Sequence, residues 1–172
     1  MPRFLELLLV LLTAPLWLPL LGVLAGIIAC VDGRPVFFRQ ERPGWHAEPF
    51  TLVKFRTMRP GTASDDERTT RLGAFLRKTS LDELPELLHV LSGKMALVGP
   101  RPLLMAYLDD YTEAEMHRHD VRPGITGWAQ VHGRNAITRA EKVQYDLEYV
   151  QKRSFLMDCR ILYRTLFHLK GN

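Results

Sequence analysis

The chain has 172 residues, a hydrophobic fraction of 47% and a formal net charge of +4 at neutral pH. This length suits one membrane segment and one compact domain, and two cysteines are too few for a disulfide framework or a Cys-rich zinc site. The positive charge suits lipid headgroups, phosphorylated substrates or nucleic acid equally well, so charge alone selects no function.

An apolar segment opens the chain, since no residue from Leu7 to Val31 carries a charge. As a straight helix it would be ~37 Å long, enough to cross a ~30 Å hydrocarbon core. Pro15 and Pro19 lie in its middle, where each removes a hydrogen bond and bends the helix. A simple span and a bent helix that does not cross are therefore both open.

Basic residues flank this segment on both sides. They are Arg3 before it and Arg34, Arg39 and Arg42 after it. The positive-inside rule places both flanks in the cytoplasm, which predicts a re-entrant hairpin over residues 1–31. A secretory signal peptide is the alternative, but the run is longer than a typical h-region, Glu6 precedes it and no clear cleavage site follows.

The remaining residues, 32–172, are expected to form one compact cytoplasmic domain. Two β-prone runs, Val36 to Gln40 and Phe50 to Arg56, are separated by a connection with proline and glycine and predict a small hairpin. Helices are expected over Thr70 to Lys78, Glu83 to Leu91, Leu103 to Tyr111 and Glu113 to Asp120, an irregular stretch over Pro123 to Gly133, and two further helices. The predicted fold class is a mostly helical α+β domain.

The final predicted helix, Phe155 to Leu169, alternates apolar residues with basic ones. This amphipathic pattern is typical of a helix that lies in the lipid interface, and it also fits a helix that faces the domain core. The sequence leaves both interpretations open, and the predicted architecture includes such interfacial helices.

An acidic pair, Asp82 and Glu83, lies at the expected start of a helix. Ser80 could cap that helix with Glu83 at the third position, or Asp82 could be the cap with Pro85 in the first turn, and we favour the second register. In both, the helix N-terminus favours the ionised acids and could hold a phosphate or a metal–phosphate complex. A well-capped surface helix is the simpler interpretation of these residues alone.

Five sequence blocks together resemble the bacterial sugar transferases in order and spacing. They are Lys54-Phe55-Arg56-Thr57-Met58, the Ser80-Leu81-Asp82-Glu83-Leu84-Pro85-Glu86-Leu87 block, Val98-Gly99-Pro100-Arg101-Pro102-Leu103, the block from Arg122 to Val131, and Gly133-Arg134-Asn135. The resemblance runs from about Phe4 to Arg164 and is closest to the small monotopic phosphoglycosyl transferases. These minimal members lack the extra transmembrane helices of larger relatives.

The resemblance implies transfer of a sugar phosphate from a UDP-sugar to a polyprenyl (undecaprenyl) phosphate at the cytoplasmic face of the bacterial inner membrane. UMP is released, and the polyprenyl diphosphosugar starts glycan assembly. It further implies that Asp82 is a covalent nucleophile and that Mg²⁺ is held by Asp82 and Glu83. Glu83 could instead handle protons, and direct transfer in a ternary complex is the alternative route.

Substrate contacts are expected of four basic residues, one of them through the resemblance. Arg77 corresponds to the basic residue just before the acidic pair and would hold a phosphate. Lys54 and Arg56 would add charge to the same pocket, and Arg101, fixed beside Pro102, would lie near the nucleotide or the phosphates. The run from Arg118 to Arg122 resembles transferases for N-acetylated, 6-deoxy UDP-sugars, but the sequence does not name the sugar.

The chain departs from the family pattern at the break in the membrane helix. Many family members have Ser-Pro there, whereas this chain has Ala14-Pro15. A carbonyl left unpaired in lipid costs several kcal/mol, and Thr13 is the nearest side chain that can bond a carbonyl three or four residues back.

Two other function classes are weighed against the enzyme. A non-catalytic membrane-anchored binding module leaves the five blocks unexplained. A nucleic-acid binder is disfavoured because Trp17, Trp45 and Trp128 are scattered and no basic-aromatic surface recurs. The oligomeric state is left open.

Overall fold

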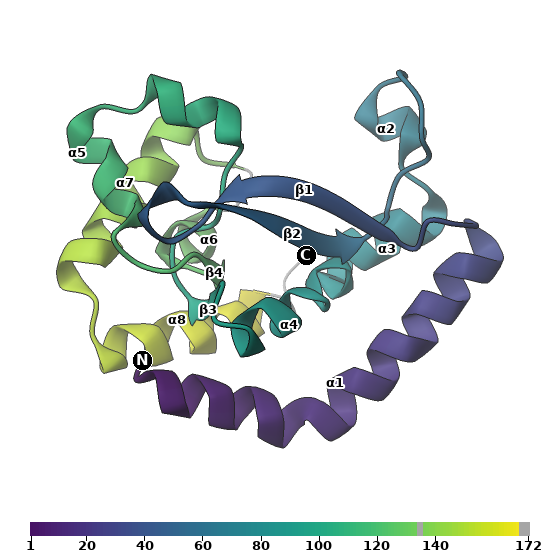
Figure 1. Cartoon of the computed structure of the whole chain (residues 1–172), viewed down its shortest axis with the longest axis horizontal. Helices are drawn as coiled ribbons and strands as arrows, with labels where there is room; N and C mark the ends of the chain where they lie inside the picture. The colour runs from purple at the N-terminus through teal and green to yellow at the C-terminus, as the bar shows by residue number, and fades with distance from the viewer. Residues whose placement is uncertain (134–135, 169–172) are drawn as a thin grey trace.

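The computed structural model describes residues 1–133 and 136–168, so Arg134 and Asn135 of the fifth block and Leu169 of the last predicted helix lie outside the described residues. A long N-terminal helix lies along one side of a mostly helical domain that contains two small sheets (Figure 1). The principal helices are α1 (Arg3–Val31), α2 (Asp65–Arg68), α3 (Arg71–Thr79), α4 (Glu86–Leu91), α5 (Glu113–Met116), α6 (Trp128–His132), α7 (Arg139–Lys152) and α8 (Phe155–His168).

Helix α1 is continuous through both prolines and bends in its middle, as predicted (Figure 1). The Thr13 hydroxyl donates to the carbonyls of Leu9 and Val10, at 2.7 and 3.2 Å, which is the bonding expected of a threonine here. Trp17 also bonds a carbonyl of this helix, which the sequence did not predict. Its Nε1 donates to the Val10 carbonyl at 3.0 Å. These bonds reach the carbonyls of Leu9 and Val10, whereas the carbonyl that Pro15 leaves without its amide donor is that of Leu11.

The outer surface of α1 is apolar. Only 17% of its most apolar 18-residue window is buried, so α1 is unlike the core helix of a soluble protein. The exposed large residues include Phe4, Leu8, Leu12, Leu16, Val23 and Val31. This surface indicates association with a membrane.

Both ends of α1 pack on the same domain. Near the N-terminus, Arg3 donates to the carbonyls of Val90 and Met95, beside α4. Near the other end, Leu24 and Ile28 are buried together with Phe55, Leu76 and partly buried neighbours. The predicted division of the chain into a membrane segment, 1–31, and a separate domain, 32–172, stays a prediction. Residues on both sides of this boundary share hydrophobic clusters.

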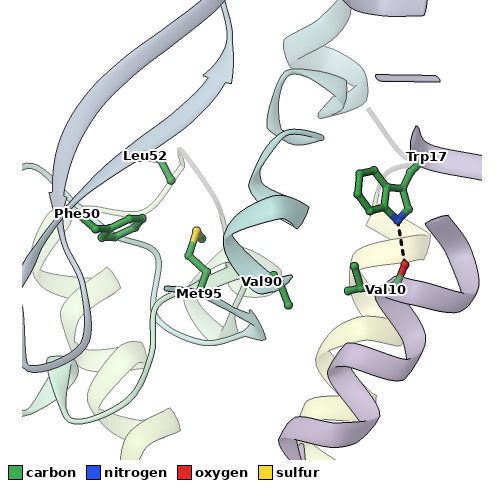
Figure 2. Close-up of a cluster of buried hydrophobic side chains, with 6 residues drawn as sticks. All are labelled: Val10, Trp17, Phe50, Leu52, Val90 and Met95. Carbon is green, nitrogen blue, oxygen red and sulfur yellow. Dashed lines mark hydrogen bonds between the residues drawn. The ribbon is translucent and has the colours of Figure 1, made fainter. Parts of the chain in front are cut away.

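The largest such cluster joins α1, α4 and the hairpin (Figure 2). Its buried members are Val10, Trp17, Phe50, Leu52, Val90 and Met95. Burial of this apolar surface stabilises the contact between the membrane helix and the domain by about 25 cal/mol per Å².

The predicted hairpin is confirmed. Strands β1 (Phe37–Pro43) and β2 (Pro49–Phe55) pair antiparallel, with Phe38 opposite Lys54. The connection contains a short 3₁₀ helix, Trp45–Ala47. Because side chains alternate along a strand, Phe38, Gln40 and Arg42 share the face on which Lys54 lies.

The acidic pair does not begin an α-helix, so the favoured capping register is wrong. Helix α3, predicted correctly, ends at Ser80 in the left-handed conformation, with φ 56°. Leu81–Glu83 then form a 3₁₀ helix without a side-chain cap, and α4 begins at Glu86, after Pro85. This short turn presents both acids at the junction of α3 and α4.

A second sheet was missed by the sequence analysis. Strands β3 (Ala96–Val98) and β4 (Gly124–Thr126) pair in parallel, and α6 follows at once, so Pro123 to Gly133 is not irregular. A Cβ on Gly124 would lie 2.1 Å from the amide nitrogen of Gly99, and one on Gly99 would lie 2.4 Å from the carbonyl oxygen of Arg122. Glycine is required at both positions because the two backbones touch there.

The connection between these strands is less helical than predicted. Instead of α-helices over Leu103 to Tyr111 and Glu113 to Asp120, it contains a 3₁₀ helix at Met105–Asp110, then α5, then a 3₁₀ helix at His117–His119.

The two final predicted helices are confirmed as α7 and α8. On α8, the large apolar residues Phe155, Leu156, Tyr163, Leu166 and Phe167 are exposed, and Ile161 is buried.

Candidate active site

A cavity of about 560 Å³ lies between the hairpin, α3 and the 3₁₀ turn with the acidic pair. We call it the cationic cavity, because seven of its lining residues are basic. The sequence predicted four of them, Lys54, Arg56, Arg77 and Arg101, and missed Arg42, Arg59 and Arg68. Asp82 and Glu83 line it as well, so six of the predicted site residues meet in one place.

Asp82 is half-buried, and no side chain among the described residues forms a hydrogen bond or ion pair with its carboxylate. Burial and the charge of Glu83 raise its pKa, against the opposing charges of Lys54 and Arg101. A carboxylate in a cationic cavity that no described side chain bonds is available to a ligand.

Glu83 is engaged, in contrast. Its Oε1 accepts from Lys54 Nζ at 2.9 Å and from Arg101 Nη2 at 2.5 Å. Burial opposes its ionisation, but the two cations outweigh this and lower its pKa to about 2. Because both bonds fall on Oε1, the other carboxylate oxygen has no partner among the described residues.

Arg101 is held from behind by a buried ion pair. Arg118, 1% exposed, donates to the Arg101 carbonyl at 2.8 Å and to Asp146 Oδ2 at 2.6 Å. The close approach of Gly99 to Gly124 fixes the same turn from the other side. The backbone at Arg101 is therefore held from both sides, and its guanidinium reaches Glu83.

The other predicted site residues, Arg77, Arg56 and Pro102, lie in different surroundings. Arg77 is exposed at the rim, with Nε donating to the Thr57 hydroxyl at 2.9 Å. Arg56 donates to the carbonyls of Asp32 and Gly33, so it also ties the end of α1 to the hairpin. Pro102 is buried and does not line the cationic cavity.

Glu86 was not singled out by the sequence analysis. It is 2% exposed, and its Oε1 lies 3.0 Å from Lys54 Nζ. Lys54 therefore bridges Glu83 and Glu86. Burial raises the pKa of Glu86 to about 7, and Glu83 adds to the rise while Lys54 opposes it.

This pKa predicts a pH-dependent stability. Glu86 binds its proton more tightly in the folded protein than at its ordinary pKa of 4.5, so it contributes stability below pH 4.5 that is lost as the pH rises to about 7. Between pH 5 and 8, wild type should lose about 1–3 kcal/mol more unfolding free energy than Glu86→Gln. Thermal unfolding in detergent across this range measures the difference, with exposed Glu41→Gln as the control. Parallel curves for wild type and Glu86→Gln would contradict it.

The donor set also bears on the predicted Mg²⁺. This ion prefers oxygen ligands and is commonly held by one or two carboxylates together with substrate phosphates. Asp82 and the unengaged oxygen of Glu83 fit that pattern. Among the described residues no group of three His, Cys, Asp or Glu side chains could hold a metal by itself, so the phosphates would have to complete the site.

Comparisons with known proteins agree with the five sequence blocks. Residues 1–171 match the family described as Bacterial sugar transferase. The chain is 54% identical over 140 residues to the protein named Uncharacterized sugar transferase EpsL of Bacillus subtilis (strain 168), covering 78% of this chain and 69% of that protein.

Two longer relatives are named UDP-glucose:undecaprenyl-phosphate glucose-1-phosphate transferase. The Xanthomonas campestris pv. campestris protein is 41% identical over 173 aligned positions, and the Escherichia coli (strain K12) protein is 40% identical over 165. The matches cover 91% and 87% of this chain but only 36% of each relative, so the chain spans about a third of their length. The chain belongs to the bacterial sugar transferase family.

Proposed function

We propose that this protein transfers a sugar 1-phosphate from a UDP-sugar to a polyprenyl phosphate and thereby initiates glycan assembly. The observation that carries the proposal is the carboxylate of Asp82, which no described side chain bonds, in a cavity lined by seven basic side chains. Both substrates are phosphate anions, and arginine is well suited to hold them. The names of the longer relatives specify this reaction for UDP-glucose and undecaprenyl phosphate.

The chemistry proceeds in two displacements at one phosphorus. An oxygen of Asp82 attacks the β-phosphorus of the UDP-sugar, the bond from that phosphorus to the bridging oxygen breaks, and UMP leaves with that oxygen. A phosphate oxygen of the lipid then attacks the same phosphorus, and Asp82 leaves as a free carboxylate. The product is a polyprenyl diphosphosugar.

The basic residues stabilise charge during both steps. Arg77, exposed at the rim and anchored through Thr57, is placed to hold a phosphate by its terminal nitrogens. Lys54 and Arg101 keep Glu83 ionised and lie next to Asp82 in the cavity. A Mg²⁺ ion on Asp82, Glu83 and the diphosphate would neutralise part of the phosphate charge.

The reaction is tested with purified protein, Mg²⁺, polyprenyl phosphate and a panel of radiolabelled UDP-sugars that begins with UDP-glucose. The proposal expects UMP and a lipid-extractable radioactive product from at least one donor. Bound UDP-sugar without any lipid product across the panel would instead indicate a binding module and overturn the proposal.

The panel also identifies the sugar. The resemblance of the run from Arg118 to Arg122 to transferases of N-acetylated, 6-deoxy sugars does not point to a sugar contact, because Arg118 is buried in an ion pair and Arg122 bonds the Gly93 carbonyl. The names of the relatives favour UDP-glucose.

We further propose that α1 enters and leaves the membrane on the cytoplasmic side. Its bend and the packing of both its ends on one domain support this geometry. Single cysteines at Pro2 and Arg34, in a chain with Cys30 and Cys159 replaced by alanine, should both resist an impermeant maleimide in intact cells. Both should react in inside-out vesicles. Labelling of one position from outside would show a true span.

Pro15→Ala provides a matched test of the bend, because it restores the missing amide hydrogen. We expect the helix to straighten toward a span and position 2 or 34 to become labelled from outside. An unchanged pattern would assign the bend to Pro19 or to the packing of α1 on the domain.

A further inference from the structure

A second cavity, of about 430 Å³, adjoins the cationic cavity. Arg77, Ser80, Glu83 and Arg101 line both, so they form the wall between the two. Beyond this wall the second cavity is bounded by α4, β4, α6, α7 and α8. The reaction described above assigns it no role.

Several polar groups of the second cavity have hydrogen-bonding capacity that the described residues leave unused. Gln130 Oε1 is buried without a hydrogen bond, while its Nε2 donates to the Ile125 carbonyl at 2.8 Å and fixes the amide. Arg118 binds only Oδ2 of Asp146, so Oδ1 is unengaged among the described residues. Lys142 lies one helical turn before Asp146 and is attracted by its charge, but its ammonium makes no hydrogen bond or ion pair within 4.0 Å with any described residue.

These groups indicate which chemical class of ligand the second cavity would bind. A polyprenyl chain would leave the oxygen of Gln130 and the charge of Lys142 unsatisfied in an apolar contact, which is unfavourable. A phosphate would be held less well here than in the cationic cavity, because two acids, Glu83 and Asp146, face three basic residues, whereas the cationic cavity has seven basic residues against two acids. Hydroxyl groups can donate to Gln130 and Asp146 and accept from Lys142, and the leucines at 84, 87 and 103 can pack on the carbon face of a ring.

The position of the second cavity is also consistent with a ligand that carries hydroxyl groups, such as a sugar ring. In a UDP-sugar the sugar is attached directly to the β-phosphate that Asp82 attacks. If the diphosphate binds to the basic residues of the cationic cavity, the sugar must lie outside that cavity. It must also stay close to the acidic pair. The second cavity begins at Glu83 and provides that space.

We propose that the second cavity binds the sugar ring of the UDP-sugar, and that Gln130, Lys142 and Asp146 recognise its hydroxyl groups. This inference rests on the proposed function, and it assigns sugar selection to α6 and α7. It separates the residues that choose the sugar from those that hold the phosphates.

Lys142→Met tests the assignment, because it removes the ammonium and keeps an unbranched side chain. A lost hydrogen bond to a charged group is worth about 1.5–3 kcal/mol, so KM for the preferred UDP-sugar should rise about tenfold or more. Inhibition by UDP, which has no sugar, should be unchanged, as should KM for polyprenyl phosphate. Lys152→Met, an exposed lysine on the same helix, is the control and should behave as wild type.

Gln130→Leu provides a second variant and should raise the same KM and alter the order of preference within the sugar panel. Melting temperatures show whether either variant is misfolded. A rise in KM for the lipid instead would assign the cavity to the polyprenyl chain, and weaker inhibition by UDP would assign it to the nucleotide. Unchanged constants in both folded variants would also overturn the inference. Absence of any lipid product from wild type would overturn the proposed function itself.

Discussion

Asp82→Asn is expected to abolish both turnover and the covalent sugar-phosphate adduct. An amide is a poor nucleophile toward phosphorus and is a weaker ligand for a divalent cation than a carboxylate. Loss of a catalytic nucleophile lowers kcat by about 10³-fold or more in well-studied enzymes. The substitution should preserve the fold, because no other described residue forms a hydrogen bond or ion pair with the Asp82 side chain.

Intact-protein mass spectrometry after incubation with the UDP-sugar, without lipid acceptor, measures the adduct. Asp66→Asn, an exposed acid of α2, is the control and should keep both adduct and turnover. Glu83→Gln should slow the reaction by about 10²-fold while leaving some adduct to trap. An adduct that persists in Asp82→Asn and disappears in Glu83→Gln would make Glu83 the nucleophile. An active wild type that never shows an adduct would favour direct transfer in a ternary complex.

Arg118→Met should produce the largest loss of stability among single side-chain changes around the site. It leaves Asp146 buried without its ion partner and removes the donor to the Arg101 carbonyl. Breaking a buried pair from one side costs about 3–5 kcal/mol, which corresponds to a fall in melting temperature of about 10 °C for a chain of this size. Turnover should fall as well, because the turn that positions Arg101 loosens.

Arg139→Met is the matched control, since Arg139 pairs with Asp110 at 2.6 Å but both side chains are about half exposed. Exposed pairs contribute about 0–1 kcal/mol, so this variant should melt within about 3 °C of wild type. Adding Asp146→Asn to Arg118→Met should recover part of the loss, because no uncompensated charge then remains. Equal losses in the two single variants would show that burial of the Arg118 pair has no special importance.

Elements with strong local signals were predictable. The uncharged run of α1, its two prolines, the hairpin and α3 all carry their pattern within a few residues. Strands β3 and β4 have three residues each and pair across the segment between Val98 and Gly124, so no local periodicity marks them. The acidic pair looked like a helix start because helical turns do follow it, and only the left-handed Ser80 separates it from α3.

The candidate site was predictable where sequence blocks marked it. Arg42, Arg59 and Arg68 were missed because basic side chains are usually solvated and nothing in their composition distinguishes them. Strand alternation was the available signal for Arg42, since Phe38, Gln40 and Arg42 lie on the same face of the hairpin as Lys54. Glu86 gave no signal beyond its block, because its importance depends on burial beside Lys54.

The attachment of α1 at both ends means that it is a structural member of the domain as well as an anchor. Val10 and Trp17 belong to the cluster of Phe50 and Val90, and Ile28 belongs to that of Phe55, the neighbour of Lys54 and Arg56. Removing residues 1–31 to obtain a water-soluble fragment would therefore open two hydrophobic clusters directly beneath the cationic cavity. A detergent or lipid that distorts this helix acts on the same residues, so the choice of membrane mimetic becomes a variable in every measurement of catalysis.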